Sequence, residues 1–254
     1  KLKVGVTDWN LGRTAKPSSI ALAKAIGFDG VEISLGRARE YLPLNDLSLQ
    51  EEFLAEAEKQ KLPIASTCLD ILHQNYLKKD PLAKRWVEES IPLTKKLGAR
   101  VILLPFFGNG KFETKAEMDY VADFLKEMGP EAAKAGVVLG LENTISAEDN
   151  VRILDRAQSP AVRVYYDVGN SHRNGFDIYK EIRWLGPERI CEFHLKDNPH
   201  LMGKGAIDFP KVIQAIVETG FSGWAHLETD APSGNVEQDM RTNLNFVRGL
   251  LAKH

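Results

Sequence analysis

Eight short runs of β-branched and apolar residues recur along the chain, and a helical stretch follows each of them. This alternation predicts βα units that build a parallel sheet. Because eight strands followed by eight helices is the number that closes such a sheet on itself, the pattern favours an α/β fold with a single (β/α)8 barrel. The expected strands are Lys3–Asp8, Gly30–Ser34, Ile64–Asp70, Arg100–Phe106, Val137–Asn143, Val162–Val168, Ile190–Asp197 and Trp224–Asp230.

The stretches between these runs carry apolar residues at three-to-four spacing, which is typical of helices with one buried face. Several of them end in a glycine-containing turn just before the next strand, as in Ala25-Ile26-Gly27-Phe28 and Lys134-Ala135-Gly136-Val137. Glycine in that place commonly ends a helix. The expected helices are Ser19–Ile26, Ser48–Lys61, Leu82–Leu97, Lys115–Ala135, Asn150–Arg156, Asp177–Leu185, Phe209–Thr219 and Val236–Ala252.

The length of 254 residues suits one barrel, since α/β barrels commonly use about 250 residues as one domain. No linker, charge block or low-complexity tract divides the chain, so we expect one domain over residues 1–254. A doubly wound open sheet is the alternative, and it normally carries a glycine-rich phosphate turn after its first strand. The residues after the first expected strand, Trp9-Asn10-Leu11-Gly12-Arg13, lack that fingerprint.

Composition and charge argue against membrane and nucleic-acid partners. The chain is 43% apolar and 27% charged, and no apolar run approaches the roughly 20 residues of a membrane-spanning helix, so we expect no membrane partner. A formal net charge of −2 gives no basic field that would attract nucleic acid. Cys68 and Cys191 lie inside apolar runs, which indicates small buried side chains and not a redox pair. No signal-peptide pattern follows Lys1, which favours a cytoplasmic location, although a leader removed before Lys1 would leave the same sequence.

Four consecutive strands end in a charged residue or histidine. The fifth to eighth expected strands carry Glu142, Asp167, His194 and Glu228 near their carboxyl ends. Polar groups in a buried parallel strand are costly, and the carboxyl ends of barrel strands are where active sites form. Because side chains alternate across a strand, one inward residue per strand at the same height places these four groups around one point.

Three carboxylates and one imidazole make a predominantly oxygen-donor site. Such a site suits one Mn²⁺ or Mg²⁺ ion, with Zn²⁺, Co²⁺ or Fe²⁺ as alternatives, because softer sites generally recruit thiolates. Without a metal, the three carboxylates would repel one another and raise some of their pKa values. The alternative is that each acid merely caps the helix after its strand, which explains one case more easily than four in succession.

Other polar and aromatic residues are expected at the same end of the barrel, as substrate contacts or as supports for the four central residues. Lys196 and His226 share the inward side of their strands with His194 and Glu228, and an ion pair with Glu192 is the competing interpretation. Asn143 and Asn170 follow the acidic positions and could instead be helix caps. Four candidates end the first four expected strands and could wall the pocket, with core packing as the competing interpretation for the two aromatic ones: Trp9, Glu32, His73 and Phe106. The remaining candidates lie in later loops: His172, His200 and Lys204.

Several motifs resemble the xylose isomerase-like TIM barrel superfamily, a group of sugar isomerases and epimerases that also holds endonuclease IV and inosose dehydratase. The resemblance spans the chain and is most specific from Val137 to Asp230. The motifs look closest to those of ketose and ketose-phosphate 3-epimerases. They are Tyr166-Asp167-Val168-Gly169-Asn170, His194-Leu-Lys-Asp197, Gly203-Lys-Gly-Ala-Ile-Asp208-Phe and Gly223-Trp-Ala-His-Leu-Glu228.

The resemblance implies that Glu142, Asp167, His194 and Glu228 hold one divalent metal. It further implies that Glu142 and Glu228 lie on opposite sides of a bound sugar or sugar phosphate and exchange a proton with it. Removal of a proton from one face and its return to the other, through a metal-stabilised enediolate, would invert one carbon. The resemblance is also compatible with a homodimer.

The sequence departs from the family patterns at informative places. Free-ketose epimerases of this type carry a His three residues after the metal Asp and an Arg six after the metal His, where this chain has Asn170 and His200. Endonuclease IV needs further His and acidic ligands that are missing here. Two alternatives to an epimerase therefore stay open: an inosose-type dehydratase or lyase of the same superfamily, and a sugar-binding barrel without catalysis.

Overall fold

The barrel predicted from the alternation is present in the computed structural model, which describes all 254 residues. Each strand pairs in parallel with the next, and the eighth pairs with the first, so the sheet is closed. The fold class expected from the sequence is thus confirmed. The strands are β1 (Leu2–Thr7), β2 (Gly30–Ser34), β3 (Ile64–Cys68), β4 (Val101–Pro105), β5 (Val138–Glu142), β6 (Val162–Asp167), β7 (Ile190–Leu195) and β8 (Gly223–Leu227).

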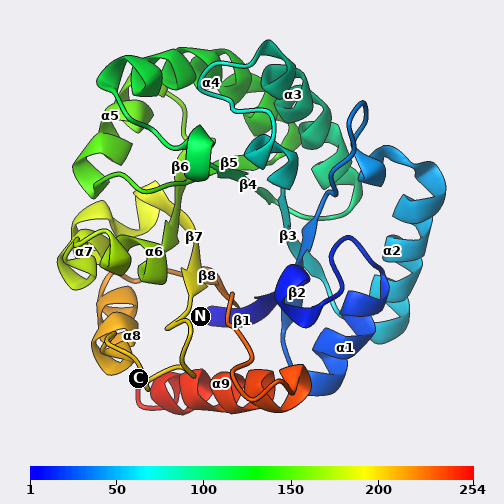
Figure 1. Cartoon of the computed structure of the whole chain (residues 1–254), viewed down its shortest axis with the longest axis vertical. Helices are drawn as coiled ribbons and strands as arrows, with labels where there is room; N and C mark the ends of the chain where they lie inside the picture. Colours follow the sequence, from blue (N-terminus) through cyan, green and yellow to red (C-terminus); the bar gives the residue numbers. More distant parts are fainter.

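The helices form an outer ring around the strands, and Figure 1 looks down the middle of the barrel. At the end of the chain α9 lies between α8 and α1 and completes this ring. None of the helices combines the length and apolar character that crossing a bilayer requires. The helices are α1 (Ser18–Ile26), α2 (Leu47–Gln60), α3 (Pro81–Lys96), α4 (Lys115–Ala135), α5 (Ala147–Ala157), α6 (Val168–Arg173), α7 (Ile178–Arg189), α8 (Phe209–Glu218) and α9 (Val236–Leu251).

The sequence pattern places the elements well, and their ends less well. The expected glycine turns are present: Gly27 and Gly136 adopt left-handed backbone conformations, with φ of 113° and 72°, and end α1 and α4. Strands β7 and β8 stop at Leu195 and Leu227, two and three residues earlier than expected. The short α6 directly after β6 was not expected, because six residues are too few to show a helical period.

The main apolar core lies between the barrel wall and the helices. Outward residues such as Val4, Val6, Val31 and Ile33 belong to one large buried cluster that includes the inner faces of the helices. The interior of the barrel holds only a small apolar cluster, formed by Cys68, Val101, Leu103 and Tyr165. Cys68 is buried, Cys191 is half-buried, and both are free thiols. The interior space is therefore left largely to polar side chains.

The polar interior depends on small residues in neighbouring strands, as Gly5 of β1 is paired with His226 of β8. A Cβ atom added to Gly5 of β1 would lie 2.3 Å from Nδ1 of the fully buried His226. We expect Gly5→Ala to lower the free energy of unfolding by about 1–3 kcal/mol, since overpacking forces a buried ring to move. Gly249→Ala, at an exposed position of α9, is the matched control, because no atom lies within 4 Å of its added Cβ, and it should leave stability unchanged or slightly raised. Urea unfolding of both variants measures the difference, and equal stabilities would contradict the expectation.

Candidate functional site

Four side chains from the last four strands meet at the carboxyl end of the barrel. Glu142 ends β5, Asp167 ends β6, His194 lies near the end of β7, and Glu228 directly follows β8. The Nδ1 atom of His194 lies 2.5 Å from Glu142 Oε2 and 3.5 Å from both Asp167 Oδ2 and Glu228 Oε2. The structure thus brings together all four residues that the strand pattern selected.

Helix capping accounts for only a part of this arrangement. Asp167 Oδ1 accepts a hydrogen bond of 2.9 Å from the backbone N–H of Asn170 and caps α6. Its other oxygen, Oδ2, is buried, faces the other three side chains and lies 2.9 Å from the Lys196 Nζ. Glu142 and Glu228 accept no bond from a helix N–H at all. The four polar ends of these strands therefore form a site, and capping is a second role of Asp167.

The cluster concentrates negative charge in a place with little water. Burial raises the pKa of Glu142 to about 8, and nearby Glu228 and Asp167 add to the rise against the pull of His194. Burial also acts to raise the pKa of Asp167, but Lys196 and His194 outweigh it and hold that pKa below its usual value. For His194 the two effects have opposite signs: burial lowers its pKa, but the surrounding carboxylates raise it well above the usual value. Because three of the four side chains are carboxylic acids, this set of residues attracts a positively charged group.

Lys196, one of the expected substrate contacts, is ion-paired inside the cluster. Its Nζ lies 2.9 Å from Asp167 Oδ2 and 2.5 Å from Glu228 Oε1. Trp9, from the short turn after β1, donates from Nε1 to Glu228 Oε2 at 3.1 Å. Glu228 is thus held by one charged and one neutral donor. That restraint fixes where its carboxylate faces.

A cavity of about 610 Å³ opens directly onto the carboxylates. Glu142 and Glu228 line it, and so do Trp9 and His73, as the sequence suggested. Arg37 and Asp70, which form an ion pair of 3.2 Å, line it as well. Sequence reasoning missed this pair. Arg37 lies in a loop, whose direction strand alternation does not give, and Asp70, expected at the end of the third strand, lies two residues beyond β3, which ends at Cys68.

A smaller cavity of about 240 Å³ lies beside Lys196. His172 and His200 line it, and so does Arg173 at the end of α6. Asn170 and Lys204 line neither cavity. The backbone of Asn170 is engaged in the α6 cap, and Lys204 is exposed in its loop.

Three further candidates have structural partners away from the large cavity. The ring of Phe106 stacks on Phe112, with the ring centroids 4.5 Å apart, so Phe106 belongs to the core. Asn143 donates to the Asn150 side chain at 2.7 Å. His226 is fully buried, and its Nε2 lies 3.2 Å from Glu192 Oε2, which is the ion pair named as the competing interpretation.

Glu32 is the residue whose position differs most from the expectation. The sequence suggested a wall of the pocket, yet Glu32 is fully buried in the middle of β2 and lies beneath His194. Its Oε1 lies 2.6 Å from His194 Nε2. Burial acts to raise the pKa of Glu32, but the two histidines and Ser66 outweigh it and lower that pKa. A carboxylate flanked by apolar residues at the centre of a strand was the feature of the sequence that could have indicated this buried position.

The chain belongs to the xylose isomerase-like TIM barrel family, whose model matches residues 20–250. One relative, 2-epi-5-epi-valiolone 7-phosphate 2-epimerase of an Actinoplanes species, is 24% identical over 198 residues, which is 78% of this chain and 73% of the relative. L-ribulose-5-phosphate 3-epimerase of Salmonella heidelberg is 25% identical over 228 residues, 80% of this chain and 78% of the relative. The similar curated proteins thus include epimerases of sugar phosphates and related compounds.

Solved structures share the whole fold at lower identity. D-psicose 3-epimerase with D-tagatose, from Clostridium cellulolyticum H10, superposes with a TM-score of 0.82 at 18% identity and covers 98% of this chain and 99% of its own. The IOLI protein, solved with a zinc atom, gives a TM-score of 0.77 at 19% identity and covers 99% of this chain and 98% of its own. These similarities support the fold and its closed barrel.

Proposed function

We propose that the protein is a metal-dependent sugar isomerase or epimerase that interconverts ketoses or ketose phosphates by proton transfer. The observation that carries the proposal is the arrangement of Glu142 and Glu228, two carboxylates that line one cavity and flank His194 and Asp167. The family and the epimerase relatives support the same class of reaction. The expected partner is a small sugar or sugar phosphate.

The donor set fits one divalent metal ion. Three carboxylates converge on the Nδ1 of His194, and the buried Asp167 Oδ2 faces into this set of donors, with the Lys196 Nζ 2.9 Å away as its close partner. Oxygen-rich sites favour Mn²⁺ or Mg²⁺, and the histidine also permits Zn²⁺, Co²⁺ or Fe²⁺. When bound, the ion polarises a carbonyl oxygen and stabilises the negative charge that develops on it. We place Mn²⁺ first, and a structural neighbour solved with zinc supports the general ability of this fold to hold a cation.

The two glutamates perform the proton transfer. One carboxylate removes the proton from the carbon next to the carbonyl, which leaves an enediolate, and the acid on the opposite side returns a proton to the other face of the same carbon. The configuration of that carbon is thereby inverted, and the protein as a whole gains and loses no proton. The indole of Trp9 offers an apolar surface to the sugar in the cavity, while its N–H keeps Glu228 oriented.

A proton NMR experiment in D₂O tests the reaction class. The Mn²⁺-loaded protein is incubated with ketoses, ketose phosphates and inososes. The expected result is solvent deuterium at the carbon next to the carbonyl, in both the recovered substrate and its epimer. A keto-deoxy product would instead show a dehydratase, in which the enediolate expels a β-hydroxyl. Tight binding of a sugar without any exchange would show a binding protein and contradict catalysis.

The orienting bond from Trp9 gives a milder variant. We expect Trp9→Phe to lower kcat about 10–150-fold with little change in KM, because one hydrogen bond to a charged group contributes about 1.5–3 kcal/mol. Steady-state kinetics on the substrate found by the NMR screen measures the effect. A change in KM alone would show that Trp9 contacts only the sugar.

A further inference from the structure

Both nitrogens of His194 are engaged, and they face opposite directions. Nδ1 faces the three carboxylates that line or adjoin the large cavity. Nε2 faces down into the barrel, where Glu32 Oε1 lies 2.6 Å away. The side chains of His194 and Glu32 are both 0% exposed, so no water competes for this bond. Strands β2 and β7 are not neighbours in the sheet, and the contact therefore crosses the interior of the barrel.

The other oxygen of Glu32 is held by two hydroxyl groups. Ser66 donates to Oε2 at 2.7 Å, and the Tyr165 hydroxyl donates to the same atom at 2.8 Å. These donors come from β3 and β6, and both residues are buried. With Oε2 so engaged, Oε1 is the atom that remains for the histidine.

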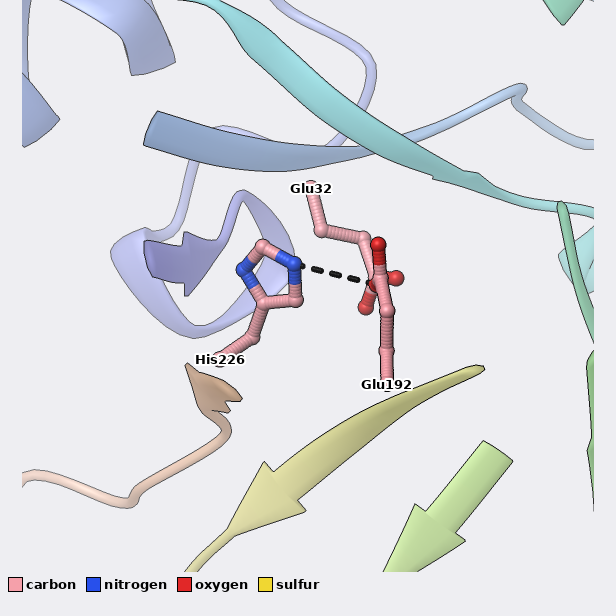
Figure 2. Close-up of side chains that lie close together, drawn as sticks. All are labelled: Glu32, Glu192 and His226. Carbon is pink, nitrogen blue, oxygen red and sulfur yellow. Dashed lines mark ion pairs between the residues drawn. The ribbon is translucent and has the colours of Figure 1, made fainter. Parts of the chain in front are cut away.

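Glu192 and His226 complete the surroundings of Glu32, and Figure 2 shows the three side chains together in the barrel interior. His226 pairs with Glu192 at 3.2 Å, so the second buried carboxylate has a histidine partner of its own. Glu192 makes no hydrogen bond or ion pair with His194. Of the two buried carboxylates, Glu32 alone contacts the histidine of the proposed metal site.

We propose that Glu32 is a positioning residue that sets the orientation and the tautomer of His194 for the divalent cation. This inference rests on the metal site of the proposed function. A neutral imidazole carries one N–H and one lone pair, and a carboxylate can only accept a hydrogen bond. A divalent cation at Nδ1 requires the lone pair there, so the neutral ring keeps its one proton on Nε2, where Glu32 Oε1 accepts it. Carboxylates that support a metal-binding histidine in this way commonly change metal affinity by about 10–100-fold.

Glu32, Glu192 and His226 could be considered as a second cation site, because their potential ligand atoms lie within 4.8 Å of one another. Glu32, however, already makes bonds to His194, Ser66 and Tyr165. Too few uncommitted donors remain around a second ion. The number of bound ions distinguishes the two interpretations, since positioning by Glu32 requires one ion per chain.

The test measures Mn²⁺ affinity by competition with a fluorescent chelator, and the number of bound ions by elemental analysis. Glu32→Leu removes both the charge and the acceptor, and should weaken binding by about 10–100-fold. Glu32→Gln keeps a carbonyl acceptor for Nε2–H and should lose less. Glu192→Gln is the matched control, because it neutralises an equally buried carboxylate that does not touch His194. It should stay within about threefold of the unmodified protein, as expected if a directed bond and not total charge sets affinity.

The outcomes separate the two proposals. If the unmodified protein binds no divalent cation, the metal site of the proposed function fails. If it binds one ion and Glu32→Leu binds it equally well, or if Glu192→Gln weakens binding as much as Glu32→Leu does, the role of Glu32 is wrong while the metal site stands. Two ions per chain would also overturn it.

A second measurement covers the case in which Glu32→Leu does not fold, as judged by circular dichroism of the metal-free protein. The visible absorption spectrum of the Co²⁺-loaded protein responds to the orientation of its ligands. It should change in Glu32→Gln and in Tyr165→Phe, and should be unchanged in Glu192→Gln. Identical spectra in all four proteins would overturn the inference.

Discussion

Glu142→Gln should lower the turnover of the ketose substrate by about a thousandfold when the metal is kept saturating. The amide preserves the size of the side chain and one oxygen ligand, but it cannot take up a proton, and positioned acid–base groups typically contribute about 10²–10⁴-fold. Glu142 lines the cavity and is the acid nearest to His194 Nδ1. Steady-state kinetics with excess Mn²⁺ measures the loss.

Isotope exchange makes this prediction more specific. With Glu142 replaced, Glu228 still faces the cavity and can still remove a proton from its own side of the sugar. We therefore expect one epimer to exchange its hydrogen with D₂O without inversion, and Glu228→Gln to leave exchange in the opposite epimer only. Loss of exchange in both epimers in each variant would contradict a division of labour between the two acids. Glu131→Gln, an exposed residue of α4, serves as the control and should retain full turnover.

Removal of divalent cations by a chelator should abolish turnover, and added Mn²⁺ should restore it. Losing several kcal/mol of charge stabilisation in the transition state corresponds to a loss of about a thousandfold or more. The same ion should stabilise the fold, by about 2.7 kcal/mol when its concentration is a hundred times its Kd. Activity assays and thermal unfolding with and without Mn²⁺ measure both effects.

Variants of the cluster provide the control for the chelator experiment. His194→Ala should lose both the activity and the thermal shift on addition of Mn²⁺, because it removes the nitrogen ligand among the four proposed metal ligands. His172→Ala, at the smaller cavity, should keep the thermal shift. A thermal shift that survives in His194→Ala would place the ion elsewhere on the protein.

The barrel and the four-residue cluster were both predictable from the sequence, for related reasons. Strand alternation can be read from neighbouring residues, so it shows which side chains face the inside of the barrel. The end of each apolar run shows how far along the barrel axis a side chain lies. Glu142, Asp167 and His194 lie where this reasoning puts them. Glu228 lies one residue beyond β8, but its backbone N–H still donates to Leu195 O at 3.1 Å, so it remains against β7.

The remaining parts of the site depend on contacts between distant segments. Glu32 is inward by the same alternation, but only the register of β2 against β3 and the tilt across the barrel place it beneath His194. Arg37 and Asp70 meet because the loops after β2 and β3 fold toward one another. No periodic pattern in the sequence predicts the contact between Glu32 and His194 or the contact between Arg37 and Asp70.

Asp167 contacts both the proposed metal centre and the start of α6, so the state of the centre can be followed by NMR without substrate. One oxygen of its carboxylate faces the proposed metal centre, and the other accepts the Asn170 amide at the start of α6. Helix α6 carries His172 and Arg173 to the smaller cavity. The Asn170 amide proton is thus a reporter, one hydrogen bond away from the ligands, whose chemical shift and exchange rate read out the state of the centre in solution.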